Sequence, residues 1–111
     1  MDNVAEGRLL RIFICESDRT GGLPLAETVV GALRGADIAG ATVLRGVAGY
    51  GGSTVIHTTH VLRLCEDLPI VIEAVDTVEK IEAVLPRIQE LVAGGLITTQ
   101  DVNIHFLPQA N

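Results

Sequence analysis

The chain has 111 residues, of which 48% are hydrophobic, which is enough for one domain with one core and excludes two domains. Its formal net charge is −6 with the basic residues scattered, and only 3% of the residues are aromatic, which excludes a phosphate-backbone surface and a base-stacking platform. It has no basic stretch leading into an apolar segment, no span of roughly 20 apolar residues and no CxxC motif, so we expect a soluble, cytoplasmic protein with reduced cysteines.

Residues 8–15 (RLLRIFIC) form a short apolar run that predicts a strand, and residues 16–22 bring the charge, Thr and paired glycines of a turn. Pro24 is favoured at the first position of a helix. The apolar residues that follow recur at helical spacing and predict a helix over about 24–38, with one face made of Leu25, Val29, Leu33 and Ala36.

A second strand is predicted after Gly40 in ATVLRGVAGY, where closely spaced glycines turn the chain into a flexible loop over 51–67. The run IVIEAV then indicates a third strand from about residue 69. Asp76 and Glu79 have the spacing of a helix cap and predict a second helix over about 77–93, kinked at Pro86. Residues 98–107 alternate and predict the last strand.

The order strand, helix, strand, strand, helix, strand is typical of an α+β, ferredoxin-like βαββαβ domain. This fold has an antiparallel four-stranded sheet with both helices on one face. The first strand is apolar on both sides, however, with Leu10 and Ile12 on one and Leu9 and Phe13 on the other. Something must cover the second face, so we expect a closed homo-oligomer.

The glycine-rich segment RGVAGYGG is the most unusual stretch of the chain. Its glycines let backbone N–H groups approach an anion, although it has neither the GK[ST] ending of a P-loop nor the G-x-G-x-x-G that opens a helix. An equally good alternative is that the segment is only a hinge.

His57, His60 and Cys65 offer two imidazoles and a thiolate, a ligand set suited to zinc or copper. Solvated histidines on a polar loop are the better interpretation, because no fourth ligand is evident and ordering the loop costs entropy. We find no catalytic triad, dyad or cofactor motif, so we expect no enzymatic activity.

Glu73 is the one acid inside an apolar strand. It requires a partner such as Arg45 or Arg63, or a place in a cleft between subunits. The other acids near strand ends have ordinary roles, with Asp18 in a turn and Asp76 as a helix cap.

Taken together, these segments resemble the PII-like (GlnB-like) signalling proteins, and in particular a branch known only as a domain of unknown function. The likeness covers most of residues 8–106. It is carried by residues 40–52 (GATVLRGVAGYGG), 56–58 (IHT), 67–81 (DLPIVIEAVDTVEKI) and 95–98 (GLIT).

The resemblance implies a homotrimer made of a single domain (1–111, core 8–107) whose loop 51–67 is the T-loop, the element that senses an effector and docks a partner protein. It also implies an adenine nucleotide in each cleft between subunits. The T-loop base of one subunit and the turn after the second helix of its neighbour would hold it. The nucleotide-binding residues are then Arg45, Gly46, Gly49, Tyr50, Gly51, Glu73, Leu96, Ile97 and Thr98.

Two departures from the PII pattern bear on the ligand. The Arg-Gln pair that follows the GFG segment of PII proteins is replaced by Gly52-Ser53, and their lysine-bearing turn after the second helix is replaced by uncharged residues. An AMP- or ADP-like effector is therefore expected, with signal transduction through the T-loop to a partner that could be a membrane transporter. The alternative is a CutA-like trimer that binds a divalent metal through His57, His60 and Cys65.

Overall fold

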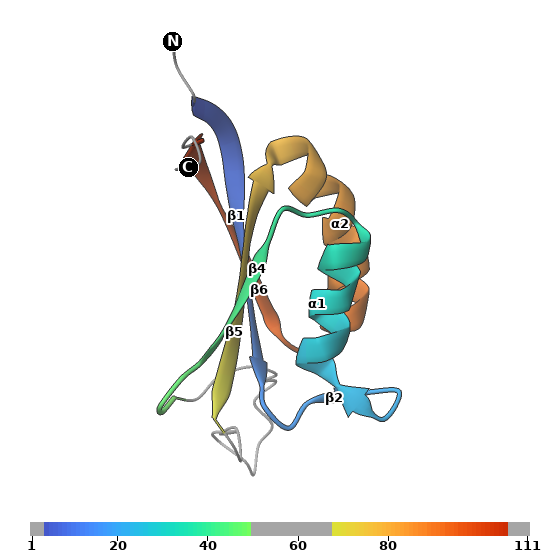
Figure 1. Ribbon diagram of the computed structural model, residues 1–111. Helices are drawn as coiled ribbons and strands as arrows, with labels where there is room; N and C mark the ends of the chain where they lie inside the picture. Colours follow the sequence, from blue (N-terminus) through green and yellow to red (C-terminus); the bar gives the residue numbers. More distant parts are fainter. Residues whose placement is uncertain (1–3, 50–67, 107–111) are drawn as a thin grey trace, which may run out of the picture.

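The computed structural model describes residues 4–49 and 68–106 (Figure 1). Within them the elements follow the order β1 (Val4–Cys15), β2 (Arg19–Thr20), β3 (Leu23–Pro24), α1 (Leu25–Gly35), β4 (Ala41–Arg45), β5 (Pro69–Thr77), α2 (Val78–Leu91) and β6 (Leu96–His105).

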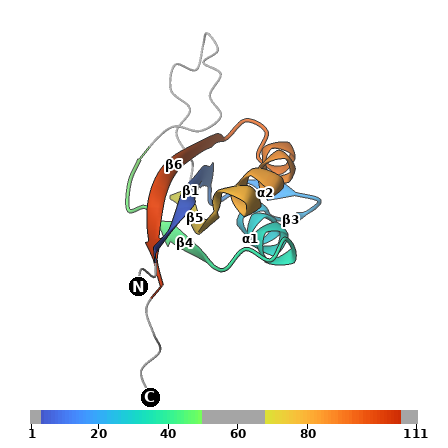
Figure 2. The same ribbon diagram turned by 90° about the horizontal axis from the view of Figure 1, so that it is seen from above.

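The four long strands form one antiparallel sheet in the order β4-β5-β1-β6. Both helices lie against the same face of this sheet, as the view from above shows (Figure 2). The predicted ferredoxin-like α+β fold is confirmed. Segment 50–67, which includes the whole predicted T-loop (51–67), lies outside the described residues.

The core lies between the helices and alternate residues of the two central strands. Strand β1 aligns Leu10 with Ala74 and Ile12 with Ile72 of β5, and these side chains are 0–3% exposed. The helices complete the core with Leu25, Val29 and Leu33 from α1 and Ile81, Val84 and Ile88 from α2. Three of the residues predicted for the first helix face are therefore buried as expected.

Helix α1 ends three residues earlier than predicted, at Gly35 rather than residue 38. Asp37 adopts a positive φ of 66°, a left-handed conformation that cannot continue a helix. Ala36 is exposed, and Ile38 turns back into the core instead, where it is 8% exposed. The turn before α1 also contains the short β2–β3 pair, which the sequence analysis did not predict.

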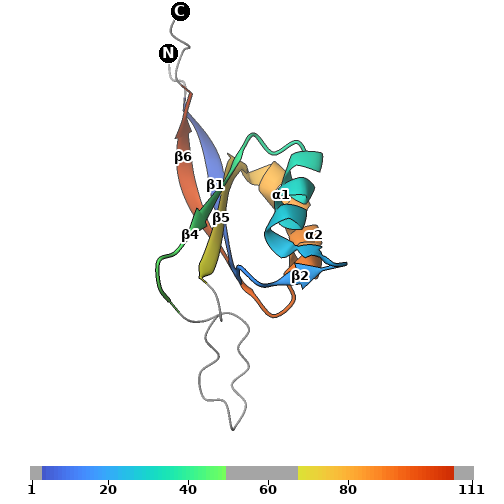
Figure 3. The same cartoon turned by 60° about the horizontal axis from the view of Figure 1, so that its bottom comes forward.

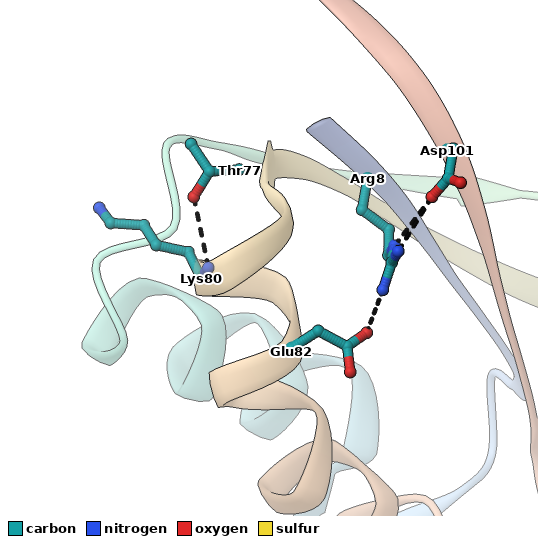
Figure 4. A network of polar contacts seen from close by, with 5 residues as sticks. All are labelled: Arg8, Thr77, Lys80, Glu82 and Asp101. Atoms are coloured by element: carbon teal, nitrogen blue, oxygen red, sulfur yellow. Dashed lines mark hydrogen bonds and ion pairs between the residues drawn. The ribbon is translucent and has the colours of Figure 1, made fainter. Parts of the chain in front are cut away.

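The prediction that Asp76 caps α2 is wrong. Thr77 is the N-cap, and its hydroxyl oxygen accepts a hydrogen bond from the Lys80 backbone N–H at 3.3 Å (Figure 4). The Asp76 carboxylate instead accepts from the backbone N–H of Ala39 at 2.8 Å, and so fixes the connection between α1 and β4. The strand β5 extends through Thr77, which shifts the cap by one residue.

Arg8 links three elements on the helix-covered face (Figure 4). From β1 it donates to Asp101 of the neighbouring strand β6 at 3.0 and 3.1 Å, and to Glu82 of α2. The hydrogen bond to Glu82, followed by that to Asp101, raises the pKa of Arg8 above its ordinary value, so the side chain stays cationic. The contact fastens α2 to the β1–β6 edge of the sheet.

The opposite face of the sheet is uncovered in the single chain, and its residues fall into rows set by the strand register. One row is apolar and runs through Leu44, Val71, Phe13 and Leu96. The next row is polar and runs through Thr42, Glu73, Arg11 and Thr98. Leu44 and Leu96 are 46% and 53% exposed, so this face offers an apolar surface larger than a soluble monomer usually shows.

Replacing a leucine in the core should cost far more stability than replacing one at the surface. Leu10→Ala removes a fully buried side chain from β1 and leaves a cavity between the sheet and the helices, which should lower the free energy of unfolding by about 2–5 kcal/mol. Urea unfolding followed by circular dichroism measures this. Leu23→Ala is the matched control, since Leu23 is 57% exposed, and an equal loss in both variants would contradict the described core.

Candidate functional site

One end of the sheet carries several of the described residues predicted to bind a nucleotide, namely Arg45, Gly46, Gly49, Leu96 and Ile97, whereas Glu73 and Thr98 lie in a row further from this end. The register aligns Arg45 of β4 with Ile70 of β5, and Ile70 with Ile14 of β1. The turn before β6 reaches the same level, because Leu96 pairs with Phe13. The end of β4 and the α2–β6 connection therefore lie at the same end of the sheet, on its two opposite edges (Figure 3).

Arg45 is the cation of the β4 edge. Its guanidinium forms an ion pair with Glu16, which follows β1 directly. The Arg45 side chain is 60% exposed and that of Glu16 is 32% exposed, so the pair can be reached from solvent. Arg45 was predicted as a phosphate contact and as a possible partner of Glu73, and the structure pairs it with Glu16 instead of Glu73.

Gly46 and Gly49 allow the chain to pass closely over Pro69. A Cβ on Gly46 would lie 2.7 Å from the Pro69 ring and one on Gly49 would lie 3.3 Å from it. The Gly46 N–H donates to the Pro69 carbonyl at 2.8 Å, so in this conformation it is not available to a ligand. The neighbouring candidates Tyr50 and Gly51 lie outside the described residues.

The turn on the β6 edge is built from Gly94 and Gly95. Gly94 has a positive φ of 90°, and a Cβ on Gly95 would meet the Phe13 carbonyl oxygen at 3.0 Å. Leu96 is exposed and can contact a ligand, whereas Ile97 packs against the core beneath the helices. The two residues thus lie on opposite faces, and only Leu96 is placed to pack on a base outside the core.

Arg19 is a cation of this region that the sequence analysis missed. It lines a cavity of about 230 Å³ together with Gly94 and Gly95. Asp18 lines the same cavity, and its carboxylate accepts the Cys15 backbone N–H at 2.8 Å, as expected of a turn residue. The sequence signal for Arg19 was its place in the turn after the first strand, but only the fold brings that turn beside the end of α2.

Glu73 has a different partner from those predicted. Its carboxylate accepts a hydrogen bond from Arg11 at 2.7 Å, so the expectation of Arg45 is wrong, and Arg63 lies outside the described residues. Glu73 and Arg11 are direct cross-strand neighbours, and opposite charges at such positions attract. Thr98 lies on the other side of Arg11. Glu73 and Thr98, both predicted to bind the nucleotide, therefore lie in one row of the uncovered face.

The alternative metal site cannot be located, because His57, His60 and Cys65 all lie outside the described residues. The part of the chain that the structure describes contains no group of three or more His, Cys, Asp and Glu side chains able to hold a metal ion. No helix in the described ranges is long and apolar enough to cross a membrane.

The fold is similar to that of structures described as PII-like proteins. A structure of CPII from Thiomonas intermedia K12, bound to ADP, AMP and acetate, superimposes with a TM-score of 0.67 at 17% identity, covering 93% of this chain and 92% of that chain. CutA from Synechococcus elongatus is also similar, with a TM-score of 0.58 at 14% identity over 91% of this chain and 79% of that chain. At these identities the likeness is one of fold.

The sequence comparisons identify the family. Residues 7–104 match the DUF190 family, described as uncharacterized ACR, COG1993, and the chain belongs to it. A UPF0166 protein of Aquifex aeolicus is 36% identical over 104 residues, covering 94% of this chain and 98% of that protein. The predicted resemblance to the branch of unknown function within the PII-like superfamily is confirmed.

Proposed function

We propose that the protein is a PII-like regulatory protein that binds an adenine nucleotide between the subunits of a homotrimer. The observation that carries this proposal is the placement of the candidate residues at one end of the sheet but on its opposite edges. The two edges are separated by β5 and β1, which is about 14 Å at ordinary strand spacing. A neighbouring copy would bring the β6 edge of one subunit to the β4 edge of the next and so complete one site.

The charges of the uncovered face also support assembly. Its only charged residues within the described strands are Arg11 and Glu73, which neutralise each other, whereas the chain as a whole carries a net charge of −6. Copies can therefore approach through this face with little repulsion. The surrounding apolar row of Leu44, Val71, Phe13 and Leu96 would then be removed from water, which stabilises the trimer.

The ligand that the site suits is an AMP- or ADP-like nucleotide. The fold is shared with CPII, which has been seen with ADP and AMP, and the cations that the described residues offer near the sheet end are Arg45 and Arg19. Phosphate requires positive charge or many N–H donors. The turn after α2 lacks the lysine of PII proteins, so a γ-phosphate would gain little.

Signalling would use segment 51–67 as a T-loop, and the partner would be another cytoplasmic protein or the cytoplasmic side of a membrane transporter. A ligand can shift the balance between conformations of this segment only if it makes different contacts with each conformation. The protein would bind its effector without chemical conversion, because Arg45 can pair with a phosphate but offers no nucleophile or proton-transfer group.

The first prediction from this proposal concerns assembly. Arg11→Ala leaves the Glu73 carboxylate unpaired on a face that the trimer would cover, and it should raise the dissociation constant of the assembly at least about tenfold. Analytical ultracentrifugation over a range of concentrations measures this. Arg11→Ala combined with Glu73→Ala should recover much of the loss, because no buried charge is left without a partner.

Arg87→Ala is the matched control for this experiment. Arg87 forms a 3.5 Å pair with Glu90 on the exposed surface of α2, so its loss should leave the assembly unchanged. A wild-type protein that stays monomeric at all concentrations would contradict the proposed trimer.

The second prediction concerns the nucleotide. Arg45→Ala should weaken AMP and ADP binding by about ten- to a hundredfold through the loss of a charge-assisted hydrogen bond, and ATP should bind the wild type little better than ADP. Calorimetric titration with AMP, ADP, ATP and cyclic AMP measures both. Arg34→Ala, at the far end of α1, is the matched control. Tight selectivity for ATP would show that the phosphate site lies elsewhere.

The third prediction concerns signalling. If AMP binds at the base of the T-loop, amide hydrogen exchange in residues 46–66 should slow when it is added, because bound ligand disfavours local opening. Exchange followed by mass spectrometry measures this peptide by peptide. Unchanged exchange in this segment at saturating AMP would refute T-loop signalling while leaving nucleotide binding intact.

A further inference from the structure

The predicted phosphate-binding cation is already neutralised within its own chain. Glu16 forms an ion pair with Arg45, and the backbone on both sides of this pair is fixed to β5. The Glu16 N–H donates to the Leu68 carbonyl at 3.0 Å, and the Gly46 N–H donates to the Pro69 carbonyl at 2.8 Å. The backbone beside the carboxylate and the backbone beside the guanidinium are thus held by two consecutive residues, Leu68 and Pro69, at the start of β5.

The turn that carries Glu16 is itself held closed. The Asp18 carboxylate accepts the Cys15 N–H at 2.8 Å, and the Asp18 N–H donates to the Cys15 carbonyl at 3.0 Å. The Glu16 side chain can therefore change its rotamer, but its backbone is held in place close to Arg45. Any anion that reaches the guanidinium meets this carboxylate close by.

We propose that Glu16 sets the ligand charge that the site accepts, by acting as a fixed counter-charge beside Arg45. This inference rests on the proposed nucleotide-binding function and adds a specificity residue to it. The sequence comparison with PII proteins had attributed weak triphosphate binding only to missing cations. The ion pair gives a second cause, which is repulsion by an acid that is present.

The physical reason is that the repulsion grows with the charge of the ligand. A phosphate must either displace Glu16 from Arg45 or share the guanidinium with it. If the phosphate displaces Glu16, the loss of binding free energy is the same for every nucleotide, because the same ion pair is broken. If Glu16 and the phosphate share the guanidinium, the repulsion between them grows with each added negative charge on the ligand. The carboxylate and the phosphates would then lie within a few ångströms of each other in the proposed cleft between subunits. A nucleotide affinity that depends on ligand charge therefore indicates that Glu16 and the phosphate share the guanidinium, and an affinity that does not indicates that Glu16 is displaced.

The test compares nucleotide binding by the wild type and by Glu16→Gln, which keeps the shape of the side chain and removes its charge. The dissociation constants of AMP, ADP and ATP are measured by calorimetry at fixed ionic strength. We expect Glu16→Gln to tighten AMP binding by about threefold and ATP binding by at least about tenfold, so that the ratio of the ATP and AMP affinities rises. A purely structural role of Glu16 would not change this ratio upward.

Glu6→Gln is the matched control. Glu6 lies near the start of β1, whereas Glu16 follows the end of that strand. Glu6 is exposed, so this variant changes the net charge equally without touching the Arg45 region. It should leave all three affinities unchanged. The double variant Glu16→Gln with Arg45→Gln should bind no better than Arg45→Gln alone, because the counter-charge acts only through Arg45.

The outcomes separate the inference from the function on which it rests. Wild-type binding of AMP or ADP with an unchanged ATP-to-AMP ratio in Glu16→Gln overturns the inference and leaves the proposed function standing. Failure of both proteins to bind any adenine nucleotide overturns both. Thermal unfolding verifies that the variant is folded. If Glu16→Gln does not fold, Glu16→Asp withdraws the carboxylate by one methylene and should raise the ratio in the same direction, and an unchanged ratio there also overturns the inference.

Discussion

The structure depends on a central strand that must bury both of its faces. Strand β1 pairs with β5 on one side and β6 on the other, and it contributes Leu10, Ile12 and Ile14 to the core beneath the helices. Its alternate residues, among them Leu9 and Phe13, form the middle of the other face. A two-layer domain of this size has only two helices to cover one face, so the second face creates the need for a partner.

The same strand also organises the charges. Arg8 on the helix-covered face holds α2 through Glu82, while Arg11 on the uncovered face pairs with Glu73. At the end of the strand, Glu16 pairs with Arg45. Arg8, Arg11 and Glu16 are thus each paired with a side chain from a neighbouring element. Such local pairing lets copies of an acidic chain approach through the apolar face with less repulsion.

Sequence patterns predicted the fold well because the strands and helices of this chain have strong, uninterrupted periodicity. They did not predict which residue caps α2, since Asp76 and Thr77 are both good caps and only the length of β5 decides between them. The structure places Arg45, Gly46 and Leu96 near one end of the sheet, and their role in binding stays a prediction. The ion-pair partners were not predicted, because the contacts of Arg45 with Glu16 and of Glu73 with Arg11 depend on strand register, which no local pattern encodes.

Because the two halves of the proposed site lie on opposite edges of the sheet, assembly and ligand binding cannot be independent. A ligand that contacts the Arg45 edge of one copy and the Gly95 edge of another binds only the assembled state, and it must stabilise that state by mass action. By the same linkage, anything that favours assembly raises ligand affinity. In the proposed trimer, the balanced charge of the uncovered face would therefore contribute to ligand affinity, although none of its residues needs to touch the ligand.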